Sequence, residues 1–442
     1  MARDGICAIA TAPGEGGIAI VRMSGAGARE IFSACFRPAR VREIVSHRMM
    51  YGHAVDARDG ALDEVMAVFF ESPNTYTRED MFEIQCHGGG VCARRVLSRV
   101  IELGARIAEP GEFTRRAFLN GRVDLSRAEA VMALIGAKSE AAARASLRQL
   151  EGGISGFVRG VGEEIKEMMA LVEACTDFPD EVDEPDAARR VREGAKRAKA
   201  ELAERCDERS ARILREGASI VLAGRPNAGK SSLMNALLRQ ERAIVTSIPG
   251  TTRDVLTERI EIGGVLAELS DTAGQRETED MVEKIGVQRA ERAMEGADVV
   301  LIVLDASKPM TAEDEALLSR ADERCIVCLN KCDLPQVWTH PGGIALSAAT
   351  GEGVEKLMEA LAGRVRDAGV MEERMTQERH LRLARRAMDA LDRAVSAIDG
   401  GDPLDVVEID LRDALCALCE ITGEDASEEV VDRVFKNFCV GK

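Results

Sequence analysis

Residues 218–237 read ASIVLAGRPNAGKSSLMNAL, and this stretch decides the fold of the central part of the chain. An apolar, β-branched run reaches Gly224, a four-residue loop follows, and Gly229-Lys230-Ser231 opens an amphipathic pattern. Glycines allow backbone N–H groups to surround a phosphate, the lysine reaches the β- and γ-phosphate oxygens, and the serine hydroxyl suits Mg²⁺. The stretch therefore predicts a strand, a P-loop and a helix that together bind a nucleoside triphosphate.

A second pair of motifs predicts which base is accepted. Asn330-Lys331-Cys332-Asp333 follows an apolar run and fits the NKxD element of GTPases. The carboxylate of Asp333 can accept hydrogen bonds from N1–H and the 2-amino group of guanine, two donors that adenine does not present together. Ser347-Ala348-Ala349 fits the SAK element with alanine in place of lysine, a mild change because that loop acts mainly through backbone N–H groups. We therefore expect GTP rather than ATP.

Two further segments match elements that respond to the γ-phosphate. Asp271-Thr272-Ala273-Gly274 ends another apolar run and supplies a Walker-B-type aspartate and a glycine N–H. Upstream, Gly250-Thr251-Thr252-Arg253-Asp254 supplies Thr252, which would complete Mg²⁺ coordination when the γ-phosphate is present. The elements occur in the order expected for a Ras-like P-loop GTPase domain.

The patterns around these motifs predict a nucleotide domain inserted into helices. Residues 215–369 alternate apolar runs with helical patterns, which predicts a largely parallel sheet. Its predicted strands are 219–224, 256–262, 265–271, 299–305, 324–330 and 343–348. Residues 121–214 and 370–442 place apolar residues at the three- and four-residue spacing of amphipathic helices. Because these segments flank a domain with its own sheet, we expect them to pack together as one discontinuous helical bundle.

Residues 1–120 predict a third part, a compact α+β domain. Its predicted strands are 6–12, 17–25, 65–73 and 81–89, and its predicted helices are 26–35 and 91–103. The predicted fold class is therefore multidomain α/β and α, with an N-terminal α+β domain, a discontinuous all-α bundle and an inserted GTPase domain. The expected boundaries give the segments 1–120, 121–214, 215–369 and 370–442.

The composition narrows the class of protein. A formal charge of −17 over 442 residues argues against nonspecific coating of nucleic acid. A local run of arginines still indicates either a solvated helical face or a polyanion-binding surface, and it comprises Arg94, Arg95, Arg99, Arg106, Arg115, Arg116, Arg122 and Arg127. There is no run of about 18 apolar residues and no export signal, so we expect no membrane span and a cytoplasmic location. The twelve scattered cysteines then favour free thiols.

The chain resembles the MnmE (TrmE) family of tRNA-modification GTPases nearly from end to end. The segments GRPNAGKSSLMNAL, TSIPGTTRD, DTAG and NKCD match the family, but any GTPase could carry them. The family itself is indicated by PGEGGIAIVRMSG at 13–25, PGEFTRRAFLNGRVDLSRAEA at 110–130 and FCVGK at 438–442.

The resemblance implies a full set of nucleotide and cation ligands. GTP would be bound by Asn227, Ala228, Gly229, Lys230, Ser231, Ser232, Thr246, Ser247, Ile248, Pro249, Gly250, Thr251, Asp271, Thr272, Ala273, Gly274, Asn330, Lys331, Asp333, Ser347, Ala348 and Ala349. Ser231 and Thr252 would hold Mg²⁺. K⁺, in place of an arginine finger, would be held by Asn227, Thr246, Ile248 and Thr251. Lys230 would stabilise charge on the phosphates in the transition state.

Two residues compete for the role of orienting the attacking water. The water-positioning carboxylate of the family falls on Glu283, which would act through a bridging water. Gln275 follows DTAG at the place where Ras-like enzymes carry the glutamine that orients water, although the family usually has an aliphatic residue there. Either residue could act, and we favour Glu283.

The resemblance also implies a homodimer and a second small-molecule site. A cofactor of the 5-formyl-tetrahydrofolate type would be contacted by Arg22, Glu83, Arg122 and Lys442. Cys439 matches a C-terminal cysteine that lies near the active centre of the family, and its role stays open.

The implied function is the modification of tRNA. With an FAD-dependent partner of the MnmG (GidA) type, the chain would install a carboxymethylaminomethyl or aminomethyl group on C5 of the wobble uridine, with a carbon unit from folate. GTP hydrolysis would drive a conformational step. One alternative is a ribosome-assembly or other RNA-associated regulatory GTPase. Another is a folate-dependent transferase with a vestigial GTPase domain, which the intact Lys230, Ser231, Asp271 and Asp333 speak against.

Overall fold

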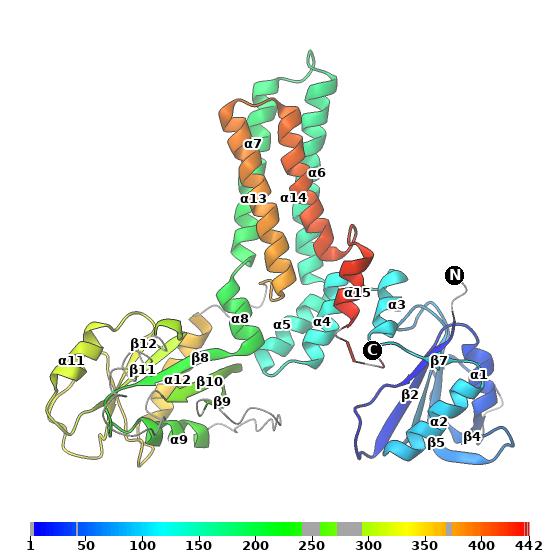
Figure 1. Cartoon of the computed structure of the whole chain (residues 1–442), viewed down its shortest axis with the longest axis horizontal. Helices are drawn as coiled ribbons and strands as arrows, with labels where there is room; N and C mark the ends of the chain where they lie inside the picture. Colours follow the sequence, from blue (N-terminus) through cyan, green and yellow to red (C-terminus); the bar gives the residue numbers. More distant parts are fainter. Residues whose placement is uncertain are drawn as a thin grey trace, which may run out of the picture. The chain divides into compact units, whose positions relative to one another are not determined.

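The computed structural model describes residues 4–40, 43–240, 257–271, 294–367, 374–436, 438, 439 and 441. The chain divides into two compact units, one made of Met1–Met132 with Cys419–Lys442 and the other of Ala133–Leu418. Each unit has its own β-sheet, and Figure 1 labels most of the helices and strands.

The first unit is built on a mixed sheet. Its described strands, in spatial order, are β3 (Phe36–Pro38), β4 (Met50–Val55), β5 (Ala61–Phe70), β6 (Met81–His87), β2 (Ile18–Ser24), β1 (Ile6–Ile9) and β7 (Arg106–Ile107). Neighbouring strands are antiparallel except β1 and β7, which are parallel. Helices α1 (Ala28–Cys35) and α2 (Gly90–Glu102) lie against this sheet (Figure 1). Their apolar side chains pack on it and form the core of the unit.

The predicted strands and helices of this part are present, but β3, β4 and β7 were not expected. β3 and β7 contain three and two residues, so neither is long enough to show an alternating pattern. β4 reads MYGHAV, and its glycine and histidine interrupt the apolar pattern that would indicate a strand. Pairing with β5 decides the conformation of β4.

Three short helices complete the first unit. They are α3 (Glu112–Leu119), α4 (Leu125–Ile135) and α15 (Glu428–Lys436). α15 is part of the C-terminal segment that the sequence pattern groups with the bundle, and it packs against α3 through Phe435, whose ring centroid lies 6.2 Å from that of Phe118. Val431 and Phe435 of α15 are buried within this unit.

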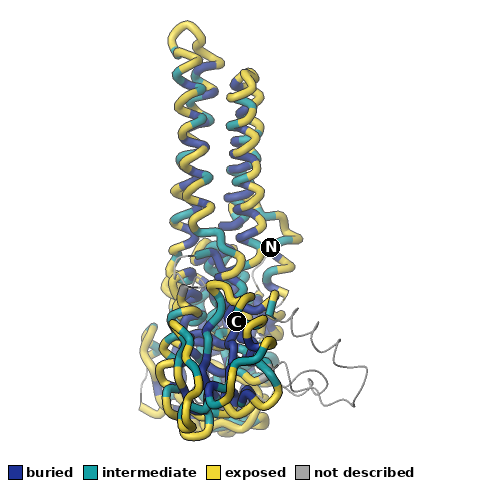
Figure 2. The backbone as a smooth tube through the Cα atoms, turned by 90° about the vertical axis from the view of Figure 1, so that its left-hand side faces the viewer, coloured by how far each residue is buried: buried dark blue, intermediate teal, exposed yellow. Residues whose placement is uncertain are grey.

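Four long helices form a bundle in the second unit (Figures 1 and 2). They are α6 (Gly153–Asp177), α7 (Glu184–Arg205), α13 (Glu378–Gly400) and α14 (Leu404–Thr422). Buried residues recur along each helix, as the amphipathic pattern predicts. α6 and α7 precede the P-loop segment in sequence and α13 and α14 follow it, so the discontinuous bundle is confirmed. No helix in the described ranges has the length and apolar composition needed to span a membrane.

The P-loop segment forms the second sheet. Its described strands, in spatial order, are β13 (Ile344–Ala345), β12 (Cys325–Asn330), β11 (Val299–Asp305), β8 (Ala218–Ala223), β10 (Val265–Asp271) and β9 (Thr257–Ile262). All neighbours are parallel except β9 and β10, so the largely parallel sheet is confirmed. Helix α11 (Ala312–Ser319) packs on one face, and α9 (Lys230–Gln240) and α12 (Val354–Asp367) pack on the other.

Two helices that precede the P-loop also belong to the core of this sheet. They are α5 (Glu140–Glu151) and α8 (Glu208–Glu216), and they contribute Ala141, Ala145, Ile213 and Leu214 to the buried cluster. The N–H of Ala141 donates to the carbonyl of Gly264, in the turn between β9 and β10, at 2.9 Å. Their docking on the sheet is a tertiary contact that the helical period alone does not predict.

α8 is further held by a buried carboxylate. Asp298, only 4% exposed, accepts hydrogen bonds from Arg209 Nε at 3.3 Å and Arg212 Nη2 at 2.5 Å through Oδ1. Its Oδ2 accepts from the N–H of Ser219 in β8 at 2.9 Å. One carboxylate therefore connects the helix that leads into the sheet with the first strand of that sheet.

Candidate functional site

The P-loop lies at the carboxyl ends of the parallel strands. β8 ends at Ala223 and has β11 on one side and β10 on the other, which is the position where α/β sheets bind ligands. Gly224 has φ 153°, and a Cβ atom there would lie 2.3 Å from the carbonyl oxygen of Val303. Only glycine allows the chain to leave β8 this close to β11.

The chain then turns round Lys230 and enters α9. Lys230 is 4% exposed, and its Nζ donates to the carbonyls of Gly224 at 2.8 Å and Arg225 at 3.0 Å. Its positive charge is therefore inside the loop, where phosphate oxygens would be bound. Ser231 and Ser232 are exposed in the first turn of α9, where the positive end of the helix dipole favours an anion.

Asn330 connects the P-loop to the loop after β13. It is 2% exposed, its Nδ2 donates to the carbonyl of Ala228 at 2.8 Å, and its Oδ1 accepts from the N–H of Ala348 at 3.0 Å. Gly229, with φ 100°, passes so close that a Cβ atom would lie 2.1 Å from Asn330 Nδ2. The asparagine of the NKxD element thus holds together the two loops that the sequence assigns to phosphate and to base.

The remaining described residues of this site surround the same edge. Ser347 is buried, its Oγ accepts from the N–H of Thr350 at 3.2 Å, and its own N–H donates to the carbonyl of Glu352 at 2.8 Å. Asp333 and Ala349 are exposed, so both are accessible to a base. This arrangement can hold a purine by its edge and a phosphate chain along the P-loop.

Part of the predicted site lies outside the described residues. These positions are Thr246, Ser247, Ile248, Pro249, Gly250, Thr251, Thr252, Thr272, Ala273, Gly274, Gln275, Glu283 and Lys442. The backbone of Asp271 is described: Asp271 ends β10 and pairs with Leu222 of β8, two positions before Gly224.

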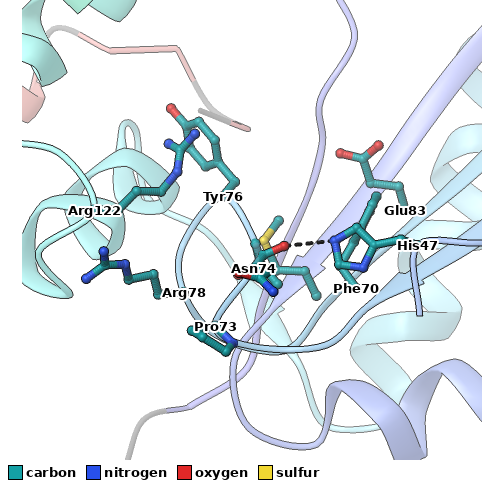
Figure 3. A pocket seen from close by; sticks show the side chains of 10 residues that line it. His47, Phe70, Pro73, Asn74, Tyr76, Arg78, Glu83 and Arg122 are labelled. Carbon is teal, nitrogen blue, oxygen red and sulfur yellow. Dashed lines mark hydrogen bonds between the residues drawn. The ribbon is translucent and has the colours of Figure 1, made fainter. Parts of the chain in front are cut away.

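A separate cavity of about 730 Å³ opens in the first unit (Figure 3). Glu83 of β6 and Arg122, which follows α3, both line it, and Tyr76 lies beside Arg122. The guanidinium carbon of Arg122 lies 4.7 Å from the centroid of the Tyr76 ring. Tyr76 and His47 also line the cavity, and neither could be predicted from the sequence because neither belongs to a motif.

Arg22 of β2 holds Glu83 from the neighbouring strand. Its Nη2 lies 2.6 Å from Glu83 Oε1, and its Nε donates to the same oxygen at 2.8 Å. Both side chains are largely buried, at 15% and 17% exposure. The pair lies opposite in the β2–β6 register, so the sheet itself brings these two predicted residues together.

The C-terminal residues reach the same place. Arg22 Nη1 donates to the carbonyl of Gly441 at 3.2 Å, and the N–H of Gly111 donates to the carbonyl of Cys439 at 3.3 Å. Gly111 has φ 71°, and a Cβ atom there would lie 2.8 Å from the carbonyl oxygen of Phe435. The C-terminal segment therefore lies beside the pair of Arg22 and Glu83. Cys439 is exposed there.

Four arginines of the run, Arg99, Arg106, Arg115 and Arg116, pair with acidic side chains. Arg116 is 11% exposed and contacts Glu79, Glu112 and Asp4, while Arg106 contacts Asp4 and Glu112. Burial alone would raise the pKa of Glu112, but hydrogen bonds, first of all that from Arg106, outweigh it and lower that pKa. These arginines serve the packing of α3, which weakens the case for a polyanion-binding surface made by the whole run.

Comparisons with known proteins cover the whole chain. A family model described as the MnmE helical domain matches residues 125–439, and one described as the GTP-binding protein TrmE N-terminus matches residues 5–122. The G domain of the T. maritima FeoB iron transporter is 25% identical, covers 34% of this chain and 98% of that chain, and has a TM-score of 0.24.

Two curated relatives carry the name tRNA modification GTPase MnmE. The protein from Geobacillus thermodenitrificans is 45% identical over 460 residues, and the match covers 99% of each chain. The protein from Levilactobacillus brevis is 42% identical over 456 residues, which cover 99% of this chain and 98% of that protein. The chain therefore belongs to the MnmE (TrmE) family of tRNA modification GTPases.

Proposed function

We infer that this chain hydrolyses GTP and acts in tRNA modification. The observation that carries the inference is the junction at Asn330, which joins the P-loop around Lys230 to the loop of Ala348 at the carboxyl edge of the sheet. The role in tRNA modification is supported by relatives named tRNA modification GTPase MnmE, which are 42% and 45% identical over 99% of the chain.

The assignment of guanine is tested at Asp333. We expect wild-type protein to release phosphate from GTP and not from ATP. Asp333→Asn should lose GTP turnover and gain turnover of xanthosine triphosphate, because xanthine replaces the 2-amino donor with a carbonyl that an asparagine amide can meet. Asp322→Asn is the matched control, since Asp322 is an exposed carboxylate that pairs with Arg324. Equal use of ATP and GTP by wild-type protein would overturn the inference.

We propose that Mg²⁺ is held by Ser231 and Thr252, and that K⁺ is held by Asn227, Thr246, Ile248 and Thr251. The described ligands fit these ions: Ser231 is exposed at the start of α9, and Asn227 is exposed in the P-loop. The carbonyl of Asn227 accepts from Lys331 Nζ, so its cation ligand would be the side-chain oxygen. K⁺ at this point would neutralise charge that develops on the phosphates.

The cation assignment is tested by GTP turnover in KCl against NaCl at equal ionic strength. Activation by K⁺ that disappears in Asn227→Ala would support it, and indifference of the wild type to K⁺ would sink it. Glu283→Ala and Gln275→Ala, measured in KCl, test which residue orients the water. Near-normal turnover in Glu283→Ala would contradict our preference for Glu283.

We propose that the cavity of the first unit takes a folate that carries one carbon unit, of the 5-formyl-tetrahydrofolate type. The residues present fit such a group, since Glu83 can accept from the amino and ring N–H groups of a pterin, and Arg122 can meet a carboxylate. Tyr76 supplies an aromatic wall beside Arg122. Lys442 would approach from the C-terminus, which Arg22 holds through Gly441. When bound, the folate would supply the carbon unit, while these residues orient it.

Calorimetric titration of the full chain with 5-formyl-tetrahydrofolate tests this site. Glu83→Gln and Arg122→Ala should each weaken binding by about tenfold or more, because each removes a charged hydrogen-bond partner. Glu102→Gln is the control, because this glutamate lies at the end of α2 and pairs with Arg99 in an exposed contact. Wild-type protein that does not bind the folate would refute the proposal without affecting the GTPase inference.

We further propose that the chain works in the cytoplasm as a homodimer with an FAD-dependent partner of the MnmG type. Together they would install a carboxymethylaminomethyl or aminomethyl group on C5 of the wobble uridine. In the proposed domain division, residues 1–120 form the folate part, residues 121–214 and 370–442 form the helical part, and residues 215–369 form the GTPase part. Cys439 would lie close to the folate. Mass analysis of tRNA nucleosides from a deletion strain tests the reaction, and an unchanged wobble uridine would contradict it. Light scattering with a γ-phosphate analogue tests the dimer.

A further inference from the structure

Lys331 bridges two loops and a strand end at the edge of the P-loop sheet. Its Nζ donates to Asp305 Oδ2 at 2.6 Å and to the carbonyl of Asn227 at 3.1 Å. Asp305 ends β11, Lys331 follows β12, and Asn227 lies in the P-loop. One ammonium group thus connects the loop that would read the base with the loop that would hold the phosphates, 104 residues earlier in sequence.

The carboxylate of Asp305 is itself oriented by its own loop. Its Oδ1 accepts from the N–H of Ser307 at 3.1 Å and from the Ser307 hydroxyl at 2.6 Å, which leaves Oδ2 directed at Lys331. Burial alone would raise the pKa of Asp305, but the hydrogen bonds from Lys331 and Ser307 outweigh it and keep that pKa below its ordinary value of 3.8. The group is therefore an anion at neutral pH.

Lys331 and Asn227, which this hydrogen bond connects, both have unusual backbone conformations. Asn227 has φ 64° and Lys331 has φ 67°, in the left-handed region that residues other than glycine seldom adopt. Such conformations persist only where surrounding contacts hold them. The contact from Lys331 Nζ to the Asn227 carbonyl joins these two turns, and Asp305 is the anion that keeps the ammonium group in place.

We propose that Asp305 is a positioning residue of the nucleotide site, which fixes Lys331 so that its Nζ ties the base-reading loop to the P-loop at Asn227. The proposal rests on the GTPase function inferred above and deepens it. Loss of the carboxylate releases Lys331 and loosens the turn at Asn227, so guanine nucleotides bind more weakly. Because Asn227 is also the proposed K⁺ ligand, a higher K⁺ concentration is then needed for half-maximal GTP turnover.

A double-mutant cycle on the full chain tests this role. Binding of methylanthraniloyl-GDP is titrated by fluorescence for wild type, Asp305→Asn, Lys331→Met and the double variant. Each single variant should bind about tenfold more weakly, the usual effect of losing one charge-assisted contact. Since Asp305 acts through Lys331, the double variant should bind no more weakly than Lys331→Met alone. In addition, Asp305→Asn should need more KCl for half-maximal GTP turnover.

The controls separate positioning from stability. Asp322→Asn, which removes an exposed carboxylate of the same domain, should leave nucleotide affinity unchanged. Losses that multiply in the double variant, or an unchanged affinity in Asp305→Asn, would overturn the proposal. If circular dichroism shows that Asp305→Asn does not fold, Ser307→Ala takes its place in the cycle. Ser307→Ala should weaken nucleotide binding about threefold, and this effect should be absent in the Lys331→Met background. Losses that multiply when the two changes are combined would again overturn the positioning role. Failure of the wild type to hydrolyse GTP would refute the inferred function, whereas the binding cycle would still report on Asp305.

Discussion

Replacement of Gly229 by alanine should damage nucleotide binding far more than the loss of one hydrogen atom suggests. The new Cβ would lie 2.1 Å from Nδ2 of Asn330, and φ at this position is 100°. A left-handed backbone costs an alanine about 1 kcal/mol. The displaced Asn330 amide also loses its bonds to Ala228 and Ala348, each with a net contribution of about 1 kcal/mol. A free variant protein avoids this cost by leaving the binding-competent loop geometry, which the nucleotide must then restore. The sum of about 3 kcal/mol therefore corresponds to roughly 100-fold weaker binding.

Fluorescence titration with methylanthraniloyl-GDP measures this effect. Gly363→Ala is the matched control, because Gly363 lies inside α12 with nothing within 4 Å of an added Cβ. That control should keep its affinity and gain up to about 1 kcal/mol of stability, since alanine is the better helix former. An affinity of Gly229→Ala within threefold of the control, in folded protein, would refute the reasoning that Gly229 and Asn330 act together.

Three further outcomes are expected. Asp298→Ala should lower the free energy of unfolding, measured in urea titrations, by about 2 kcal/mol. The figure is smaller than for a fully buried ion pair because Arg209 and Arg212 are partly exposed. A loss below about 0.5 kcal/mol would contradict the role of Asp298 in holding α8 to the sheet. The hydrogen bond to Asp63 raises the pKa of His87 above its ordinary value of 6.5. The contribution of this pair to folding stability is therefore full below pH 6.5 and is lost as the pH rises through the pKa of His87 in the folded protein. Asp63→Asn should return the ring titration, followed by NMR, to about 6.5. Gly111→Ala should speed amide exchange in α15, and unchanged exchange would show that the close approach is tolerated.

How much of the site could be predicted from the sequence depended on the distance between partners along the chain. Gly224, Gly229 and Lys230 fall within seven consecutive positions, so their spacing alone indicates a phosphate-binding turn. Asn330 was found because its motif is short and follows an apolar run. Asp305 is a single aspartate at the end of a strand, and nothing near it in sequence marks it as the partner of Lys331.

Distance along the chain also separates the residues at the cavity of the first unit. Arg22 and Glu83 are predicted site residues only through the resemblance to a family, because 61 positions separate them and no local pattern links them. Their pairing depends on the antiparallel register of β2 and β6, which pairs Arg22 with Glu83 across the sheet. Tyr76 lies in the loop before β6 and becomes part of the site only when Arg122 packs over its ring.

The sequence by itself determined the longer strands of both sheets, the P-loop between β8 and α9, and the interruption of the helical bundle by a largely parallel sheet. These features depend on local spacing, apolar period and glycine positions, which are properties of consecutive residues. The tertiary structure alone decided the docking of α5 and α8 on the sheet, the clamp at Asp298, the bridge from Asp305 through Lys331 to Asn227, and the meeting of Arg22 with Glu83 and Gly441. The physical reason is that hydrogen bonds and ion pairs depend on distances in space, which strand register and helix packing set between residues far apart in the chain.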